Sequence, residues 1–318
     1  MSTQLDIPVL FILFNRPRHA RKVLEQIRQA QPKELFIAID GPRPNHPTDR
    51  EQVAQCTALL DEIDWPCQVY KLIQPRNLGC KRGVSTAITW FFEQVEMGII
   101  LEDDCLPDPS FFTFCRETLL YHQHNSSVMH ISGVNFQGGQ RHGDGSYFYS
   151  KICHIWGWAT WRRAWAKYDV SMQSYAEFRQ NQVIKDLFTD QKVQQFWTEA
   201  FDGVYAGQID TWDYQWCYTI WTSGGICVCP NQNLISNIGF GQDATHTKED
   251  TESTGNQPLQ TLTEIVHPRF LIESRRATEY SLHKFFRKVS GIKQRMENIT
   301  NKPGLKNVKT TFRKHLLP

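Results

Sequence analysis

The chain has 318 residues, of which 40% are hydrophobic and 21% charged, a balance that is ordinary for a globular protein with a sizeable core. The formal net charge of +2 at pH 7 provides no strong overall field for binding nucleic acid. The nine cysteines form no paired CxxC motifs, which favours reduced, mostly buried thiols in a cytosolic protein over disulfides or structural zinc.

The first 105 residues alternate predicted strands and helices. Apolar runs predict strands at 9–14, 35–39, 67–73 and 98–101, of which the first is of the buried, parallel-sheet kind. Helical patterns predict helices at 20–27, 50–63 and 82–95. This alternation implies an α/β protein with a central, mostly parallel sheet flanked by helices. No GxGxxG motif follows the first strand and no GxxxxGK[ST] motif occurs, which argues against dinucleotide oxidoreductases and P-loop enzymes.

Each of these strands is followed by polar residues. They are Asn15 and Arg16, Asp40, Asn77, and the triplet Glu102-Asp103-Asp104. In open α/β sheets such strand ends converge on one crevice that collects ligands. Three adjacent carboxylates repel one another, and a divalent cation such as Mg²⁺ or Mn²⁺ would compensate them. A solvated acidic turn, or a carboxylate that caps the following helix, are the alternatives.

The pattern is less regular after residue 107. Helices are predicted at 111–121 and 175–205 and strands at 128–133 and 225–229, with a block of aromatic residues at 156–165. Residues 284–314 contain ten Lys or Arg and one acid, so this tail is either a solvated extension or a peripheral contact with anionic lipid. No signal peptide or membrane-spanning run is visible, and a cytoplasmic protein is expected.

Three motifs, in this order, give the chain a resemblance to a known family. They are Phe14-Asn15-Arg16 with Asp40; Leu101 to Asp104 followed by a proline and Phe111-Phe112; and Trp212-Asp213 to Trp216 followed by Cys227–Pro230, Asn237–Gly241 and His246. The chain resembles nucleotide-diphospho-sugar glycosyltransferases of the GT-A fold, most closely the inverting N-acetylglucosaminyltransferase I type. The resemblance covers roughly residues 8–247. Tyr214 departs from it, because that family often has a second acidic residue there.

The resemblance implies a single GT-A catalytic domain over residues 1–280. Its nucleotide-binding half would be 1–105 and its acceptor-binding half 106–280, and residues 281–318 would form a basic C-terminal tail. A GT-A enzyme uses Mn²⁺ or Mg²⁺ as a Lewis acid on the leaving diphosphate. Asp104 would bind this metal directly. His246 would reach the metal or the diphosphate, and a surface loop histidine is the alternative for it. Asp103 and Glu102 would contact sugar or ribose hydroxyls, or water on the metal.

The resemblance also assigns the nucleotide pocket. Asp40 would accept a hydrogen bond from a uracil ring N–H, although an Asp-Gly-Pro turn offers a purely structural explanation. Arg16 would pair with the phosphates or stack beside the base. Asn15, Asn77 and Arg82 would line the same pocket, and solvated loop positions are the alternative for the last two.

Asp213 is the candidate general base, because inversion requires a carboxylate on the acceptor side to take the proton of the attacking hydroxyl. A helix N-cap is the alternative for this residue, and Asp210 is the reserve candidate for the base. Trp158, Trp212 and Trp216 are predicted to contact a sugar, although core packing is the more common fate of a tryptophan.

The expected activity is transfer of a sugar, first N-acetylglucosamine, from a UDP-sugar to a hydroxyl of a glycan or lipid-linked acceptor, with inversion and a metal ion. Such an enzyme would serve polysaccharide biosynthesis on the cytoplasmic side of the membrane. Two alternatives remain: a sugar-1-phosphate nucleotidyltransferase, which would normally have a glycine-rich loop after the first strand, and a non-catalytic sugar-nucleotide-binding protein of the same fold.

Overall fold

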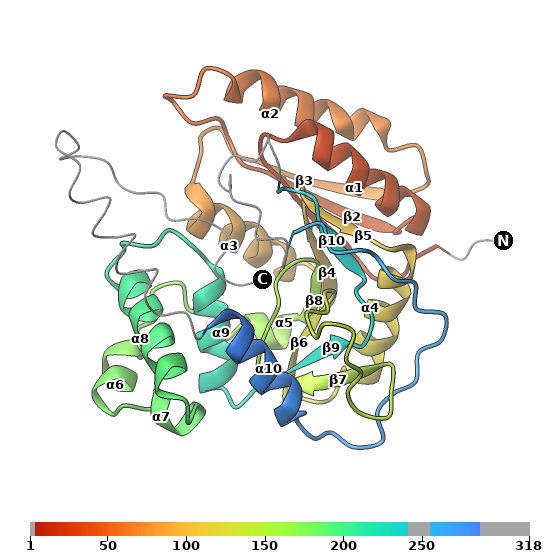
Figure 1. Ribbon diagram of the computed structural model, residues 1–318. Helices are drawn as coiled ribbons and strands as arrows, with labels where there is room; N and C mark the ends of the chain where they lie inside the picture. The colour runs from red at the N-terminus through yellow and green to blue at the C-terminus, as the bar shows by residue number, and fades with distance from the viewer. Residues whose placement is uncertain (1–3, 241–254, 287–318) are drawn as a thin grey trace.

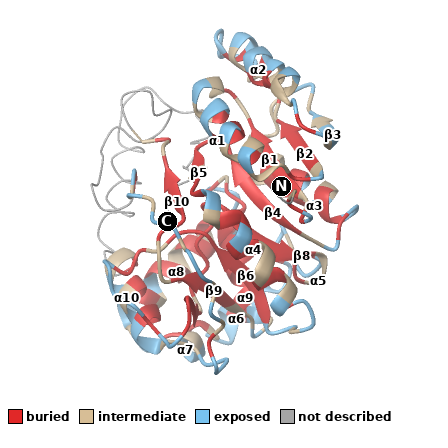
Figure 2. Ribbon diagram, turned by 90° about the vertical axis from the view of Figure 1, so that its right-hand side faces the viewer, coloured by how far each residue is buried: buried red, intermediate tan, exposed pale blue. Residues whose placement is uncertain are grey.

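The parallel half of the central sheet is formed by four strands. They are β1 (Val9–Leu13), β2 (Glu34–Ile39), β3 (Gln68–Ile73) and β4 (Met97–Glu102), in the spatial order β3-β2-β1-β4. The computed structural model, drawn in Figure 1, describes residues 4–240 and 255–286. Strands β1, β2 and β4 are almost entirely buried (Figure 2), because helices cover both faces of a parallel sheet.

Three helices connect these strands. They are α1 (Pro17–Ala30), α2 (Asp49–Ala58), which continues into the 3₁₀ turn η1 (Leu59–Glu62), and α3 (Gly79–Phe92). Helices α1 and α2 lie together on one face and α3 lies on the other (Figure 1), as right-handed crossovers require when the strand order reverses after β3. Pro17 at the first turn of α1 favours helix initiation directly after the Asn15-Arg16 segment.

The second half of the chain extends the sheet with antiparallel and parallel strands. They are β6 (Val128–Ser132), β7 (Tyr147–Ser150), β8 (Trp158–Trp161) and β9 (Ile226–Pro230). Strand β8 pairs antiparallel with β4, and the order continues β8-β6-β9-β7 to give eight strands. Four of the seven strand pairs are parallel. The predicted α/β class, with a mostly parallel central sheet flanked by helices, is confirmed.

A small second sheet continues the strand that carries the carboxylates. Strand β5 (Cys105–Pro107) follows β4 after only two residues and pairs antiparallel with β10 (Ile235–Asn237). The backbone N–H of Ile238 donates a 2.8 Å hydrogen bond to the carbonyl oxygen of Asp104. The acidic turn is therefore held by a different sheet on each side.

Further helices follow in the second half of the chain. They are α4 (Pro109–Tyr121), α5 (Arg162–Trp165), α6 (Tyr175–Gln180), α7 (Ile184–Leu187), α8 (Gln191–Tyr205) and α9 (Asp213–Thr222). The predicted continuous helix over 175–205 is wrong, because the structure has three helices there. The breaks occur at Gln182, which has a positive φ of 55°, and at Asp190, whose side chain caps α8.

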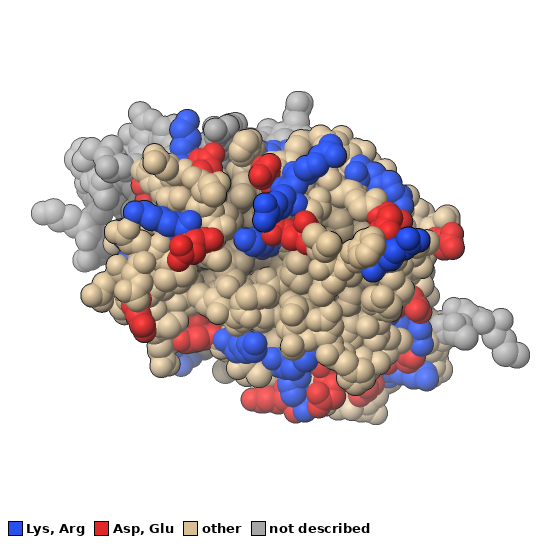
Figure 3. Space-filling model, turned by 90° about the horizontal axis from the view of Figure 1, so that it is seen from below, with Lys and Arg blue, Asp and Glu red and all other residues tan. Residues whose placement is uncertain are grey.

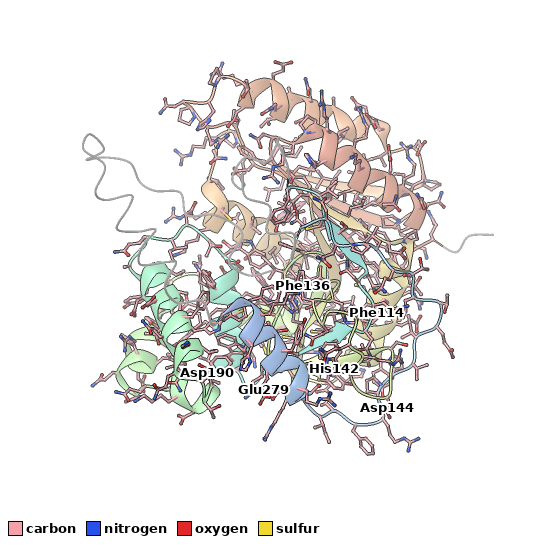
Figure 4. All side chains as sticks on the ribbon, in the orientation of Figure 1. Phe114, Phe136, His142, Asp144, Asp190 and Glu279 are labelled. Atoms are coloured by element: carbon pink, nitrogen blue, oxygen red, sulfur yellow. The ribbon has the colours of Figure 1, made fainter. Side chains whose placement is uncertain are left out.

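The predicted domain boundary between residues 280 and 281 falls inside a packed helix, α10 (Arg275–Phe285). Leu282 and Phe286 are buried. The helix packs on the loop that carries Phe136 and His142 (Figure 4), where Nε2 of Gln137 donates to Oγ of Ser281 at 2.9 Å. The described part of the predicted tail thus belongs to the core, and residues 287–318 lie outside the described residues.

The surface carries charges of both signs. Seen from below, groups of Lys and Arg have Asp or Glu close by (Figure 3), so neither sign covers this face. Within the part of the chain that the structure describes, no helix has the length and apolar character needed to cross a membrane.

Gly157 is predicted to be indispensable for packing at the junction of the two sheets. Its φ is +58°, and a Cβ atom there would lie 2.4 Å from Cδ1 of Ile235. Gly157→Ala should therefore combine backbone strain with overpacking and lower the free energy of unfolding by about 2–4 kcal/mol, measured by chemical denaturation.

Gly207→Ala is the matched control, because Gly207 also has a positive φ, of 70°, but nothing lies within 4 Å of the position that the added methyl group would take. This variant should lose only the strain, about 1–2 kcal/mol. Equal losses in the two variants would contradict the packing argument.

Candidate functional site

A cavity of about 360 Å³ opens at the carboxyl ends of the parallel strands. Its polar lining comes from the segments after β1, β2, β3 and β4, and includes Asn15, Arg16, Asp40, Asn77 and Asp103. Apolar side chains of β1, β2 and α3 form the rest of the lining. Mostly apolar walls with a few polar groups are the usual composition of a small-molecule site.

Asp40 organises one corner of this cavity. Its carboxylate accepts hydrogen bonds from the backbone N–H groups of Gly41 (2.9 Å) and Leu78 (3.0 Å) and from Nδ2 of Asn77 (2.9 Å). Gly83 faces the same carboxylate, and a Cβ there would lie 3.1 Å from Oδ2 of Asp40. The structural explanation from the Asp-Gly-Pro turn is therefore present, and the same carboxylate also lines the cavity.

A buried ionic network forms a second corner. The carboxylate of Asp49 accepts from Nδ2 of Asn15 at 2.9 Å and from Nε and Nη2 of Arg43 at 2.7 and 2.9 Å. Burial opposes the charged form of Asp49, yet the hydrogen bonds from Arg43 and Asn15 hold its pKa at about 2. Arg43 also lies over the ring of Phe14, 5.3 Å from its centroid, and so fixes the β1 and β2 ends relative to each other.

Sequence reasoning missed Arg43, His46 and Asp49, although the first two line the cavity. They lie in the loop after β2 or at the start of α2, three to nine residues beyond Asp40. Reading each strand-end loop to the start of its helix, instead of stopping at the first polar residue, would have included them.

The acidic turn is the third corner, and it is buried. Glu102, Asp103 and Asp104 are each at most 6% exposed. Nη1 of Arg16 lies 2.6 Å from Oδ2 of Asp104 and 3.8 Å from Oδ1 of Asp103. Burial lowers the pKa of Arg16, but the charges of Asp104, Asp103 and Glu102 outweigh it and raise that pKa. Neither alternative predicted from the sequence, a solvated turn or a cap of the following helix, describes this triplet, because Asp108 caps α4.

The chemistry of these donors suits a divalent cation that also binds substrate phosphates. Within residues 4–240 and 255–286, no group of three or more His, Cys, Asp or Glu side chains is arranged to hold a metal by itself. Mg²⁺ is commonly bound by one or two carboxylates together with substrate phosphates, however. Asp103 and Asp104 supply two adjacent carboxylates at the edge of the cavity. His246, predicted as a ligand, lies outside the described residues.

The two candidate bases lie in different environments. Asp210 lines the cavity, and its carboxylate accepts from the backbone N–H groups of Cys80 (3.1 Å) and Lys81 (3.3 Å) at the start of α3. Asp213 is buried at the start of α9, where it accepts from the hydroxyl of Thr211 and from the backbone N–H of Tyr214. Burial raises the pKa of Asp213 to about 6 against these hydrogen bonds, and the charge of Glu102 adds to the rise.

The structure buries the three tryptophans that were predicted to contact a sugar, Trp158, Trp212 and Trp216, and core packing, the alternative, describes them. All three side chains are at most 1% exposed. Trp158 stacks on Trp212 with a centroid distance of 5.5 Å, and Trp216 donates from Nε1 to Nδ1 of His130 at 3.2 Å. Burying the large apolar area of an indole is favourable, and the rings of Trp212 and Trp216 anchor the first turn of α9 in the core.

Arg82 is an exposed residue of α3 and does not line the cavity, so the solvated alternative describes it better than the predicted nucleotide contact. The structure thus brings Asn15, Arg16, Asp40, Asn77 and Asp103 together, with Asp104 beside them through Arg16.

No protein-family model matches the sequence, and comparison with curated proteins gives no match. Among solved structures, the mannosyltransferase PcManGT from Pyrobaculum calidifontis, in complex with GDP-Man and Mn²⁺, is 13% identical, with a TM-score of 0.34. The match covers 50% of this chain and 45% of the mannosyltransferase.

HddC from Yersinia pseudotuberculosis is 11% identical over 49% of this chain and 77% of its own, with a TM-score of 0.31. A UDP-glucose pyrophosphorylase complexed with UDP-glucose is 11% identical over 48% of this chain and 64% of its own, with a TM-score of 0.27. Scores this low assign no activity to the chain.

Asp213→Asn is expected to change how stability depends on pH. The folded-state pKa of about 6 exceeds the ordinary value of 3.8, so folding favours the protonated carboxyl. That contribution is complete at about pH 4 and is lost as the pH rises through 6. The free energy of unfolding of the variant, relative to wild type, should therefore improve by about 2–3 kcal/mol between about pH 4 and pH 8, measured by chemical denaturation.

Asp49→Asn is the control with the opposite sign. The pKa of Asp49 is lowered to about 2, so its carboxylate stabilises the fold above about pH 4 and this contribution is lost on acidification. The free energy of unfolding of this variant should fall further below that of wild type as the pH rises from about 2 to 5. A difference for Asp213→Asn that does not change with pH would contradict the burial argument.

Proposed function

We propose that the chain is an inverting glycosyltransferase of the GT-A type that transfers a sugar from a nucleotide diphosphate to a hydroxyl of a glycan or lipid-linked acceptor. The observation that carries the proposal is the convergence of four strand-end segments on one cavity that has acidic and basic side chains together. Open α/β sheets bind nucleotides at such an edge. UDP is the proposed nucleotide, and N-acetylglucosamine the first sugar to test.

The base and ribose of the donor would occupy the corner formed by Asp40 and Asn77. The apolar floor from β1, β2 and α3 offers a surface for a flat ring. The carboxylate of Asp40, which lines the same corner, would accept a hydrogen bond from a ring N–H. The cavity volume of about 360 Å³ falls within the range of small-molecule sites. Arg16 and Arg43 bring two guanidinium groups to the side where the phosphates would lie.

Asp103 and Asp104 would hold the divalent cation, Mn²⁺ or Mg²⁺, together with the diphosphate oxygens. When bound there, the cation would act as a Lewis acid that stabilises the negative charge of the leaving nucleotide. The residues of the chain then have the tasks of orienting the phosphates, through Arg16, and of holding the carboxylates in place, through β4 and β5.

Asp213 is the proposed general base. A pKa of about 6 keeps its carboxylate ionised at neutral pH and still basic enough to take a proton from an attacking hydroxyl. Asp210, the reserve, lines the cavity, and backbone N–H groups at the start of α3 donate to both of its carboxylate oxygens.

The test combines binding with product analysis. Purified protein is incubated with UDP-sugars and Mn²⁺, and the products are identified. Release of UDP with transfer, or slow hydrolysis of the donor, supports the proposal. Formation of UDP-sugar from UTP and a sugar-1-phosphate, with pyrophosphate, supports the nucleotidyltransferase alternative. Binding without turnover supports a non-catalytic protein of the same fold.

Asp40→Ala is expected to weaken UDP binding by about tenfold or more, because a half-buried hydrogen-bond acceptor is removed from the ring-binding corner. The measurement is the UDP-induced rise in melting temperature, converted to affinity by titration. Arg82→Ala, on the exposed face of α3, is the control and should bind UDP like wild type. Equal effects of the two substitutions would argue against this placement of the base.

Asp213→Asn should lower kcat by at least about 10²-fold while leaving the affinity for UDP unchanged, because only proton transfer is impaired. Asp210→Asn should instead affect stability and substrate affinity through the start of α3. Loss of kcat in Asp210→Asn, with a fully active Asp213→Asn, would reverse the assignment.

A further inference from the structure

The carboxylate proposed to bind the cation is already engaged by a cationic side chain. Nη1 of Arg16 lies 2.6 Å from Oδ2 of Asp104, and the two side chains are 13% and 5% exposed. At this distance and burial the pair is a charge-assisted hydrogen bond with little screening by solvent. A metal ion cannot approach the same oxygen while the guanidinium is there.

Breaking this pair is costly unless both partners find new ones. Removing one member of a buried ion pair is strongly destabilising, because it leaves the other charge uncompensated. A divalent cation held by Asp103 and Asp104 would compensate both carboxylates, but it would take from Arg16 its 2.6 Å contact with Asp104 and compete for Asp103, which lies 3.8 Å from Nη1. Binding of the cation alone is therefore opposed by the arginine that it displaces.

The guanidinium of Arg16 can move away from Asp104 toward the cavity. Gly239 packs against the pair on one side, since a Cβ there would lie 2.6 Å from Oδ2 of Asp104 and 3.0 Å from Nη1 of Arg16. Arg16 also lines the cavity, at the edge where the phosphates of the proposed donor would lie. A diphosphate offers the guanidinium a bidentate anionic partner there.

We propose that Arg16 couples the binding of the divalent cation to the binding of the nucleotide diphosphate, an inference that rests on the proposed function. Without nucleotide, Arg16 occupies Asp104 and disfavours the cation. When a nucleotide diphosphate binds, Arg16 transfers to its phosphates and Asp104 becomes available to the cation. The site therefore takes up the metal together with its substrate, and the free protein binds the metal weakly.

The test is the affinity of the nucleotide-free, full-length protein for Mn²⁺, measured by the loss of the free Mn²⁺ signal in electron paramagnetic resonance. Arg16→Met should bind Mn²⁺ roughly tenfold or more tightly than wild type, because Asp104 loses its competing cation. Arg16→Gln, which can still donate a hydrogen bond to Asp104 and is more certain to fold, should change in the same direction. Arg16→Lys retains the charge and should remain near wild type.

Two controls isolate the site. Arg82→Met changes the net charge by the same amount on the exposed face of α3 and should leave Mn²⁺ affinity unchanged, so a general electrostatic effect is excluded. Asp104→Asn, combined with Arg16→Met, should remove the gain. If neither Arg16→Met nor Arg16→Gln binds Mn²⁺ more tightly than Arg82→Met, the coupling role of Arg16 is refuted.

Failure of the proposed function would be recognised separately. Wild-type protein that binds neither UDP nor UDP-sugars by thermal shift, with or without Mn²⁺, contradicts the proposed donor. The exchange between Arg16 and Mn²⁺ at Asp104 would still be measured in the absence of any nucleotide.

Discussion

The structure depends on how three consecutive carboxylates are kept inside a folded protein. Glu102, Asp103 and Asp104 lie at the end of a buried strand, where repulsion among them would be strong if nothing compensated it. Arg16 provides compensation from the neighbouring strand end, because β1 and β4 are adjacent and parallel. The strand order of the sheet thus brings a cation next to the anions, and the same order places both at the edge of a cavity.

The arrangement of the cavity follows from the same constraint. Each parallel strand delivers its following loop to one edge, and these loops together form three polar corners, around Asp40, around Asp49 and around Asp104. These corners are internally satisfied by hydrogen bonds, so they are organised before any ligand arrives. A ligand that replaces one of these hydrogen bonds with its own therefore binds at a smaller cost in conformational entropy than a ligand that must first order a solvated loop.

The sequence predicted the parallel half of the fold well, because apolar runs such as Val9–Leu13 have no other stable environment than a sheet covered on both faces. It also predicted five residues of the cavity, because the polar residues that follow parallel strands lie at the same edge of the sheet. It did not predict the ion pair of Arg16 with Asp104, because strand adjacency depends on the order β1-β4, which local pattern does not encode.

The second half was harder to predict for two physical reasons. A tryptophan that stacks on a sugar and one that packs in the core look the same in a sequence. Tertiary packing decides between the two, and here Trp158 stacks on Trp212. The region 175–205 has helical propensity throughout, and its division into α6, α7 and α8 depends on single positions such as Asp190. The sequence predicted Asp213 as the general base, but it did not predict that this side chain is buried.

The small sheet of β5 and β10 has a consequence for how the acidic turn is assembled. Asp103 and Asp104 form the whole link between β4 and β5, and the partner of β5 is supplied by residues 235–237, more than a hundred positions later in the chain. Strands β1 to β4 have their parallel partners within the first 102 residues, but this link acquires its second anchor only after β10 has been added. A nascent or truncated chain that ends before Ile235 would therefore contain every carboxylate of the turn and still present them in an unfixed geometry.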